Sequence, residues 1–105
     1  MHSQLKWDGI LIRAPLGQDV HAVSAGKVVF SDWLSGYGLL LIINHGHGYM
    51  SLYARNNSLY KQVGDIVQKG EVIATIGKSG GYRTPSLYFA IRYNGKPVNP
   101  GIWCG

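Results

Sequence analysis

Short apolar runs, separated at glycine and proline, dominate this chain, and no stretch keeps the periodicity of an amphipathic helix. Breaking the sequence at these residues predicts strands joined by tight turns, at residues 9–13, 18–23, 26–34, 38–44, 49–54, 71–76 and 87–93. This spacing is typical of a compact β sandwich or a partly open barrel. We therefore predict an all-β fold in a single domain over residues 1–105.

Two of the predicted strands differ in their pattern. Residues 39–43 are apolar at consecutive positions, which indicates a central strand covered on both faces. Residues 51–55 alternate between polar and apolar, which indicates a strand with one exposed face.

Composition supports one core and leaves the compartment open. The chain is 46% hydrophobic, and its fifteen glycines and seven tyrosines suit strands and turns better than helices. Cys104 is the only cysteine, so we expect no internal disulfide and no thiolate metal site. Residues 1–4 lack the apolar core of a signal peptide and are expected to form a tail, and no apolar run is long enough to span a membrane.

The net charge of +5 is compatible with nucleic acid, an anionic envelope polymer or an acidic protein partner. Because the basic residues are scattered, with no dense tract and no aromatic RNA-binding signature, we do not expect a nucleic-acid partner.

The pair His45 and His47 is the one candidate metal motif that the residues themselves offer. On a strand these side chains would share a face and could bind a metal. They alternate with glycines, however, which indicates a turn, and His2 and His21 stand in no matching position. We predict no metal site, and expect His45 to be a hydrogen-bonding turn residue.

The order of short motifs along the chain resembles the LytM domain, the lysostaphin-type domain of peptidase family M23. The matching segments are residues 9–17, 25–29, 36–38, 44–49, 51–53, 63–70, 76–77, 85–92 and 98–100. The resemblance implies a LytM-type β sandwich. It also implies that a first strand of the family domain, and an N-terminal coiled coil found in some members, are absent from these 105 residues.

Active members of this family hold zinc with two histidines and an aspartate, and two further histidines handle the attacking water. Such a site leaves one metal position open for a water whose pKa the zinc lowers. Carried over by resemblance, the zinc-ligand positions are Trp7, Leu11 and Tyr88, and the water-handling positions are Arg55 and Ser86. All five are replaced, so the resemblance implies a pseudoenzyme with no catalytic residue and no cofactor.

Residues 5–7, 32–38, 50–53 and 85–89 resemble the EnvC-type subgroup of degenerate LytM domains. Members of this subgroup activate N-acetylmuramoyl-L-alanine amidases, which split peptidoglycan during cell division. The resemblance therefore implies a monomeric periplasmic activator whose partner is a cell-wall amidase. Ala90 stands where these domains usually carry a glutamate.

In a zinc peptidase of this shape the metal lies on the floor of a groove, and apolar replacements would turn that floor into a binding site for an amphipathic helix. We expect Tyr88 to be the anchor and Arg92 to pair with an acidic residue. The full expected binding set is Leu11, Tyr37, Leu40, Arg55, Tyr88 and Arg92.

Three other interpretations remain open. The chain could be a zinc endopeptidase with unorthodox ligands, or a peptidoglycan-binding module that uses tyrosines and basic residues against glycan strands. Without the resemblance, Leu11 and Tyr88 would be ordinary core residues, and Arg55 and Arg92 solvated surface charges.

Overall fold

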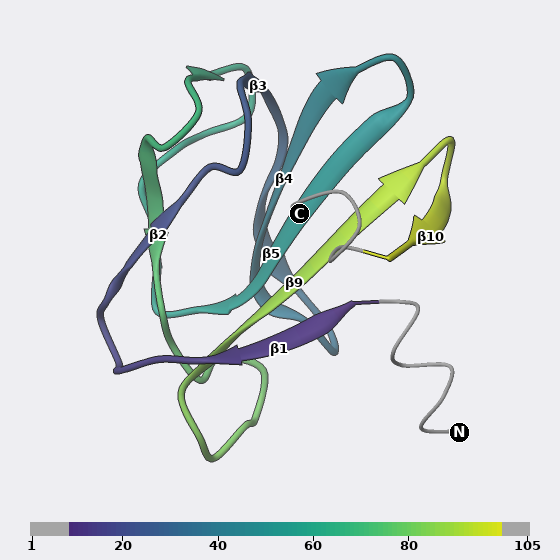
Figure 1. The fold of residues 1–105 in the computed structure, drawn as a ribbon. Coiled ribbons are helices and arrows are strands. Elements are labelled where there is room, and N and C mark those ends of the chain that lie inside the picture. Colours follow the sequence, from purple (N-terminus) through teal and green to yellow (C-terminus); the bar gives the residue numbers. More distant parts are fainter. Residues whose placement is uncertain (1–8, 100–105) are drawn as a thin grey trace.

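The structure is a computed structural model that describes residues 9–99, and its regular elements in this range are strands (Figure 1). No helix in this range is long and apolar enough to cross a membrane. The elements are β1 (Ile10–Arg13), β2 (Asp19–His21), β3 (Gly26–Leu34), β4 (Gly38–Gly46), β5 (Tyr49–Asn56), β6 (Ser58–Leu59), β7 (Ile66–Val67), β8 (Val72–Thr75), β9 (Ser86–Tyr93) and β10 (Lys96–Val98).

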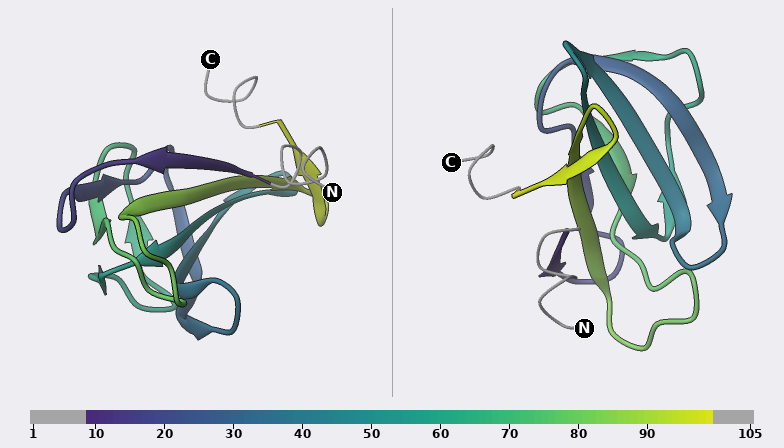
Figure 2. Two further views of the ribbon diagram at one scale, coloured as in Figure 1. Left: turned by 90° about the horizontal axis from the view of Figure 1, so that it is seen from below. Right: turned by 90° about the vertical axis from the view of Figure 1, so that its right-hand side faces the viewer.

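The strands form two antiparallel sheets. The large sheet has the order β1-β9-β5-β4-β3-β7, with β10 also paired to β9, and the small sheet has the order β2-β8-β6. Figures 1 and 2 show β2 and β10 at opposite sides of the molecule. The sheets do not close into a barrel, so the predicted all-β sandwich is confirmed.

The main core lies between the two sheets. On β9 the odd-numbered side chains Leu87, Phe89 and Ile91 face the small sheet, where they join Val20 and Ile73. Burying a large apolar side chain of this kind stabilises a fold by roughly 1.5–3 kcal/mol.

A second apolar cluster covers the opposite face of the large sheet. It contains Leu40, Leu52, Ala54 and Ala90, with Tyr88 among the half-buried residues that pack against it. Because β5 lies between β4 and β9 and is covered on both sides, residues 51–54 are all buried. The prediction that this strand has one exposed face is therefore wrong.

The remaining strand predictions are mostly confirmed. Strand β3 has the predicted bounds, and β4, β5 and β9 differ from them by one or two residues. In β4, Leu40, Leu41 and Ile43 are buried, as expected for a central strand. The three strands β6, β7 and β10 were not predicted.

The loop between β8 and β9 is tied to the β3–β4 turn and to the end of β5. Ser79 Oγ donates to the Asn56 carbonyl at 2.6 Å and accepts from the Leu39 N–H at 2.9 Å. Gly38 makes this approach possible, because a Cβ there would lie 2.5 Å from Ser79 atoms. Tyr82 Oη donates to the Gly36 carbonyl at 2.8 Å. This loop therefore forms one wall of the candidate site.

Candidate binding groove

A cavity of about 320 Å³ opens on the face of the large sheet that the small sheet does not cover. We call it the aromatic groove. Its lining combines three tyrosines, two arginines and two small residues, namely Gly36, Tyr37, Ala54, Arg55, Tyr82, Tyr88 and Arg92.

Strands β5 and β9 build the floor of the aromatic groove. Tyr88, Ala90 and Arg92 alternate along β9 and so share a face, and Ala54 lies opposite Tyr88 in the register. Ala54 lines the groove, and its small size leaves space between the larger side chains, whereas Ala90 is fully buried and does not line the groove. Tyr37 packs against Tyr88 with ring centroids 6.1 Å apart.

Arg55 has a left-handed backbone conformation, with φ of 68°. Its N–H donates to the Tyr37 carbonyl at 2.8 Å, and its carbonyl accepts from the Ser79 N–H at 3.3 Å. Its guanidinium carbon lies 3.4 Å from the Tyr82 ring centroid and 6.0 Å from that of Tyr88. Left-handed geometry costs a non-glycine residue about 1–2 kcal/mol, which these contacts offset.

Gly9 fixes the position of the Tyr88 ring. A Cβ on Gly9 would lie 2.7 Å from Tyr88 Cζ and 2.8 Å from its hydroxyl oxygen. With any larger residue at position 9, either the Tyr88 ring or strand β1 would therefore have to move.

Four of the five positions assigned by resemblance to the zinc site come together. Leu11 is the register partner of Tyr88, Ser86 lies two residues earlier on the same face, and Arg55 approaches the Tyr88 ring. Trp7 lies outside the described residues.

These side chains do not fit a zinc ion. They offer a hydrocarbon, a permanent cation and two hydroxyl groups, whereas zinc sites in proteins use imidazole, thiolate or carboxylate. Within residues 9–99 no group of three or more His, Cys, Asp and Glu side chains could hold a metal.

The predicted binding residues divide into three groups. Tyr37, Arg55, Tyr88 and Arg92 line the aromatic groove, and Leu11, which is 56% exposed, lines the adjoining pocket. Leu40 was expected to form part of the wall, but it is 1% exposed and packs in the cluster beneath the groove. That prediction is wrong because β4 is a central strand whose side chains are covered on both faces.

Tyr82 was missed by sequence reasoning. It lies in a glycine-rich loop, outside every predicted strand, where strand patterning has no meaning. The sequence did offer one signal. Tyr82 is an aromatic residue that directly follows two glycines, in a short segment that begins with Lys78 and ends with Arg83.

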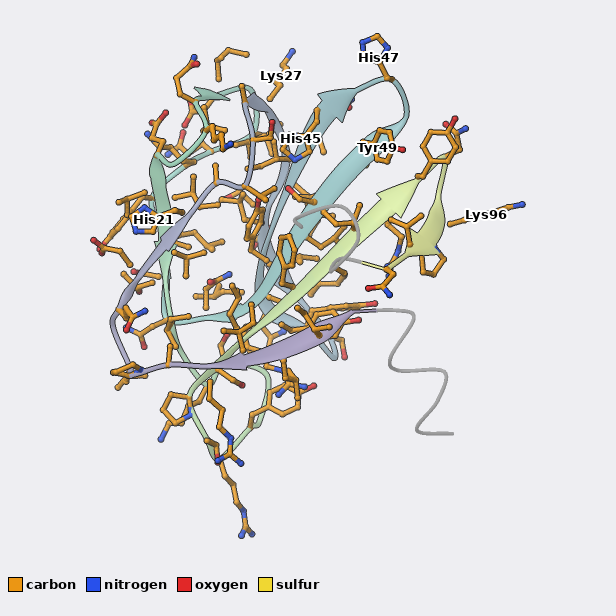
Figure 3. All side chains as sticks on the ribbon, viewed as in Figure 1. His21, Lys27, His45, His47, Tyr49 and Lys96 are labelled. Atoms are coloured by element: carbon orange, nitrogen blue, oxygen red, sulfur yellow. The ribbon has the colours of Figure 1, made fainter. Side chains whose placement is uncertain are left out.

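The three histidines among residues 9–99 do not line the groove, and Figure 3 shows His21, His45 and His47 on different parts of the fold. His45 Nδ1–H donates to the Ala25 carbonyl at 2.8 Å, and its Nε2 lies 2.6 Å from Ser51 Oγ. The predicted hydrogen-bonding role of His45 is thus confirmed, although it stands at the end of β4. His47 occupies the turn at φ of 54°. His2 and Cys104 lie outside the described residues.

An open two-layer β sandwich with a groove on strands β5 and β9 is the architecture of a LytM-type domain. The chain belongs to peptidase family M23, whose sequence model matches residues 5–100.

Two relatives of the chain are both named murein hydrolase activators. The chain is 47% identical to the murein hydrolase activator EnvC of Escherichia coli over 105 residues, which is all of this chain and 25% of that protein. It is 43% identical to the murein hydrolase activator NlpD of the same species over 93 residues, or 88% of this chain and 24% of that protein. The chain thus spans about a quarter of the length of these relatives.

Solved structures of peptidases share the fold. A putative M23 peptidase from Pseudomonas aeruginosa superposes with a TM-score of 0.89 at 26% identity, over 92% of this chain and 43% of that one. The catalytic domain of lysostaphin from Staphylococcus simulans gives a TM-score of 0.86 at 25% identity, over 91% and 77% of the two chains.

Proposed function

We propose that this chain is a non-catalytic activator of periplasmic N-acetylmuramoyl-L-alanine amidases. It binds a regulatory helix of the amidase in the aromatic groove, and this binding displaces the helix from the position in which it inhibits the enzyme. In this proposal the domain belongs to a longer exported protein and acts as a monomer.

One observation carries the proposal. The described residues at the matched positions, Leu11, Arg55, Ser86 and Tyr88, lie together, but they offer aliphatic, guanidinium, hydroxyl and aromatic groups instead of a zinc-ligand set. The names of the EnvC and NlpD relatives, both murein hydrolase activators, support an activating role.

The groove suits a helix. Tyr88 presents a large ring with few rotatable bonds, which is typical of an anchor residue at an interface. The small side chain of Ala54, which lines the groove opposite Tyr88, leaves room for the apolar side chains that an amphipathic helix projects at successive turns. Arg55 and Arg92 flank this floor and can hold carboxylates at its margin.

A dye-release assay on labelled peptidoglycan tests the proposal. Purified chain alone should release no dye, and the chain added to an amidase should raise the rate of release. Arg92→Ala should lower this stimulation by about tenfold, since losing one charged contact at an interface costs roughly 1.4 kcal/mol or more. Absence of stimulation by the unmodified chain, or release by the chain alone, contradicts the proposal.

A further inference from the structure

All four arginines of the chain line two adjoining pockets, whereas the described lysines line neither of them. The second pocket, which we call the basic pocket, has a volume of about 220 Å³. It is lined by Leu11, Arg13, Arg55, Tyr82, Arg83, Thr84 and Ser86.

The basic pocket continues the aromatic groove. The two share Arg55 and Tyr82 as lining residues. Arg13 lies opposite Ser86 in the register of β1 and β9, on the same face as Tyr88 and Arg92. Arg13 and Arg92 thus mark the two ends of one continuous surface.

The charged residues that the structure describes on this surface are all arginines. Among residues 9–99 the carboxylates are Asp19, Asp32, Asp65 and Glu71, and none of them lines either pocket. The choice of arginine matters, because a guanidinium binds carboxylates through two parallel hydrogen bonds and sheds water more readily than an ammonium.

We propose that the aromatic groove and the basic pocket form one docking surface for an amphipathic helix with acidic residues at both ends of its apolar face. Arg92 binds the acidic residue at one end, and Arg13 with Arg83 binds that at the other. This inference rests on the proposed function and specifies the chemistry of the partner helix.

The register sets the spacing of these acidic residues. Ser86 and Arg92 are six residues apart on β9, which corresponds to about 20 Å in an extended strand. A helix rises about 1.5 Å per residue, so roughly 13 residues cover this length. The partner helix should therefore carry its two acidic groups about three to four turns apart.

Charge reversal tests the inference in the dye-release assay. The test variant is the double substitution Arg13→Glu with Arg83→Glu. The control is Lys27→Glu with Lys96→Glu, which changes the net charge equally at exposed positions that Figure 3 shows on other parts of the fold. The test variant should need about tenfold more protein for half-maximal stimulation, corresponding to roughly 1.4 kcal/mol, and the control less than about twofold.

The outcomes separate this inference from the proposed function. If the unmodified chain stimulates the amidase and both double variants behave alike, the basic pocket has no part in binding and only this inference is overturned. If the unmodified chain gives no stimulation, the proposed function fails as well. Circular dichroism melts check that each variant is folded. If the double glutamate variant does not fold, the double variant Arg13→Gln with Arg83→Gln takes its place in the assay.

Synthetic peptides test the acidic requirement directly. Three helical peptides with one common apolar face carry Glu, Gln or Lys at positions about 13 residues apart. Fluorescence anisotropy should rank binding to the chain as Glu, then Gln, then Lys, and added salt should weaken the Glu peptide most. Equal binding of the Glu and Gln peptides, or equally tight binding of a polyanion such as heparin, overturns the inference.

Discussion

The guanidinium of Arg55 stacks on the ring of Tyr82, with 3.4 Å between its central carbon and the ring centroid. This contact joins the end of β5 to the loop before β9, and it stands between the aromatic groove and the basic pocket. The stacked pair therefore shapes both cavities at once.

The backbone of Arg55 gives a first prediction. Arg55→Ala and Arg55→Gly both remove the stacked guanidinium, but only glycine adopts a φ of 68° without strain. The glycine variant should therefore be more stable than the alanine variant by about 1 kcal/mol, or several degrees in Tm. Thermal melts followed by circular dichroism measure the difference, and an alanine variant that melts at the same temperature or higher would count against it.

The ring of Tyr88 gives a second prediction. Tyr88→Phe keeps the aromatic surface beside Tyr37, whereas Tyr88→Leu loses it. Because large rigid rings supply most of an anchor's contact energy, the phenylalanine variant should retain most amidase stimulation, and the leucine variant should lose about tenfold or more. Tyr60→Leu is the matched control, since Tyr60 is 56% exposed and lines neither pocket. Equal losses in Tyr88→Leu and Tyr60→Leu would exclude Tyr88 as the anchor.

Gly9 gives a third prediction. Gly9→Ala would place a Cβ 2.8 Å from the Phe89 carbonyl oxygen and 2.7 Å from Tyr88 Cζ, so either strand β1 or the ring must move. We expect reduced amidase stimulation with little change in the circular dichroism spectrum. Gly17→Ala is the control, because a Cβ there meets nothing within 4 Å although its φ is 86°. If both variants lose stimulation equally, the effect is general destabilisation.

The fold was predictable where a strand is long enough to show a pattern. Strands β3, β4, β5 and β9 each contain eight or nine residues, and their bounds were found within two residues. Strands β6 and β7 contain two residues each, which is too few to show any alternation. The exposure of β5 was mispredicted because burial depends on which strands lie beside it, and that order is a tertiary property.

The candidate site was predictable in part, through resemblance. Positions 11, 55, 86 and 88 were matched to the family motifs, and the register brings them together. Motif matching placed Leu40 in the groove wall, whereas the continuous apolar run at residues 39–43, which predicts a strand covered on both faces, was the correct guide to its burial. Motif matching could not show the convergence of Arg13 and Arg83 with Arg55, since these residues come from three separate segments of the chain.

A surface ion pair gives a prediction about pH. Lys61 Nζ lies 2.5 Å from Glu71 Oε2, and the Gln68 N–H donates to Glu71 Oε1 at 2.9 Å. The hydrogen bond from Lys61, followed by that from Gln68, lowers the pKa of Glu71 below its ordinary value. A lowered folded-state pKa stabilises the fold above the unfolded pKa of about 4.3, and this contribution disappears as the pH falls through the lower folded value.

Glu71→Gln should therefore be less stable than the unmodified chain at pH 7, and the difference should vanish at acidic pH. Urea midpoints measured at a series of pH values between 7 and 3 test this. Because the pair is partly exposed, added salt should also reduce the difference at pH 7. A difference that persists unchanged into acid would show that the carboxylate charge is not its cause.

Metal dependence separates the proposed activator from the zinc peptidase alternative. A ligand that binds only the folded state at 100 times its Kd stabilises it by about 2.7 kcal/mol, which would raise Tm by roughly ten degrees or more in a domain of this size. We expect no such change in the Tm of the unmodified chain when zinc replaces a chelator. The triple variant Trp7→His, Leu11→Asp and Tyr88→His restores the ligand types that the resemblance assigns to these positions, and its Tm should rise with zinc. A zinc-dependent rise in the unmodified chain that His45→Ala abolishes would favour the peptidase alternative instead.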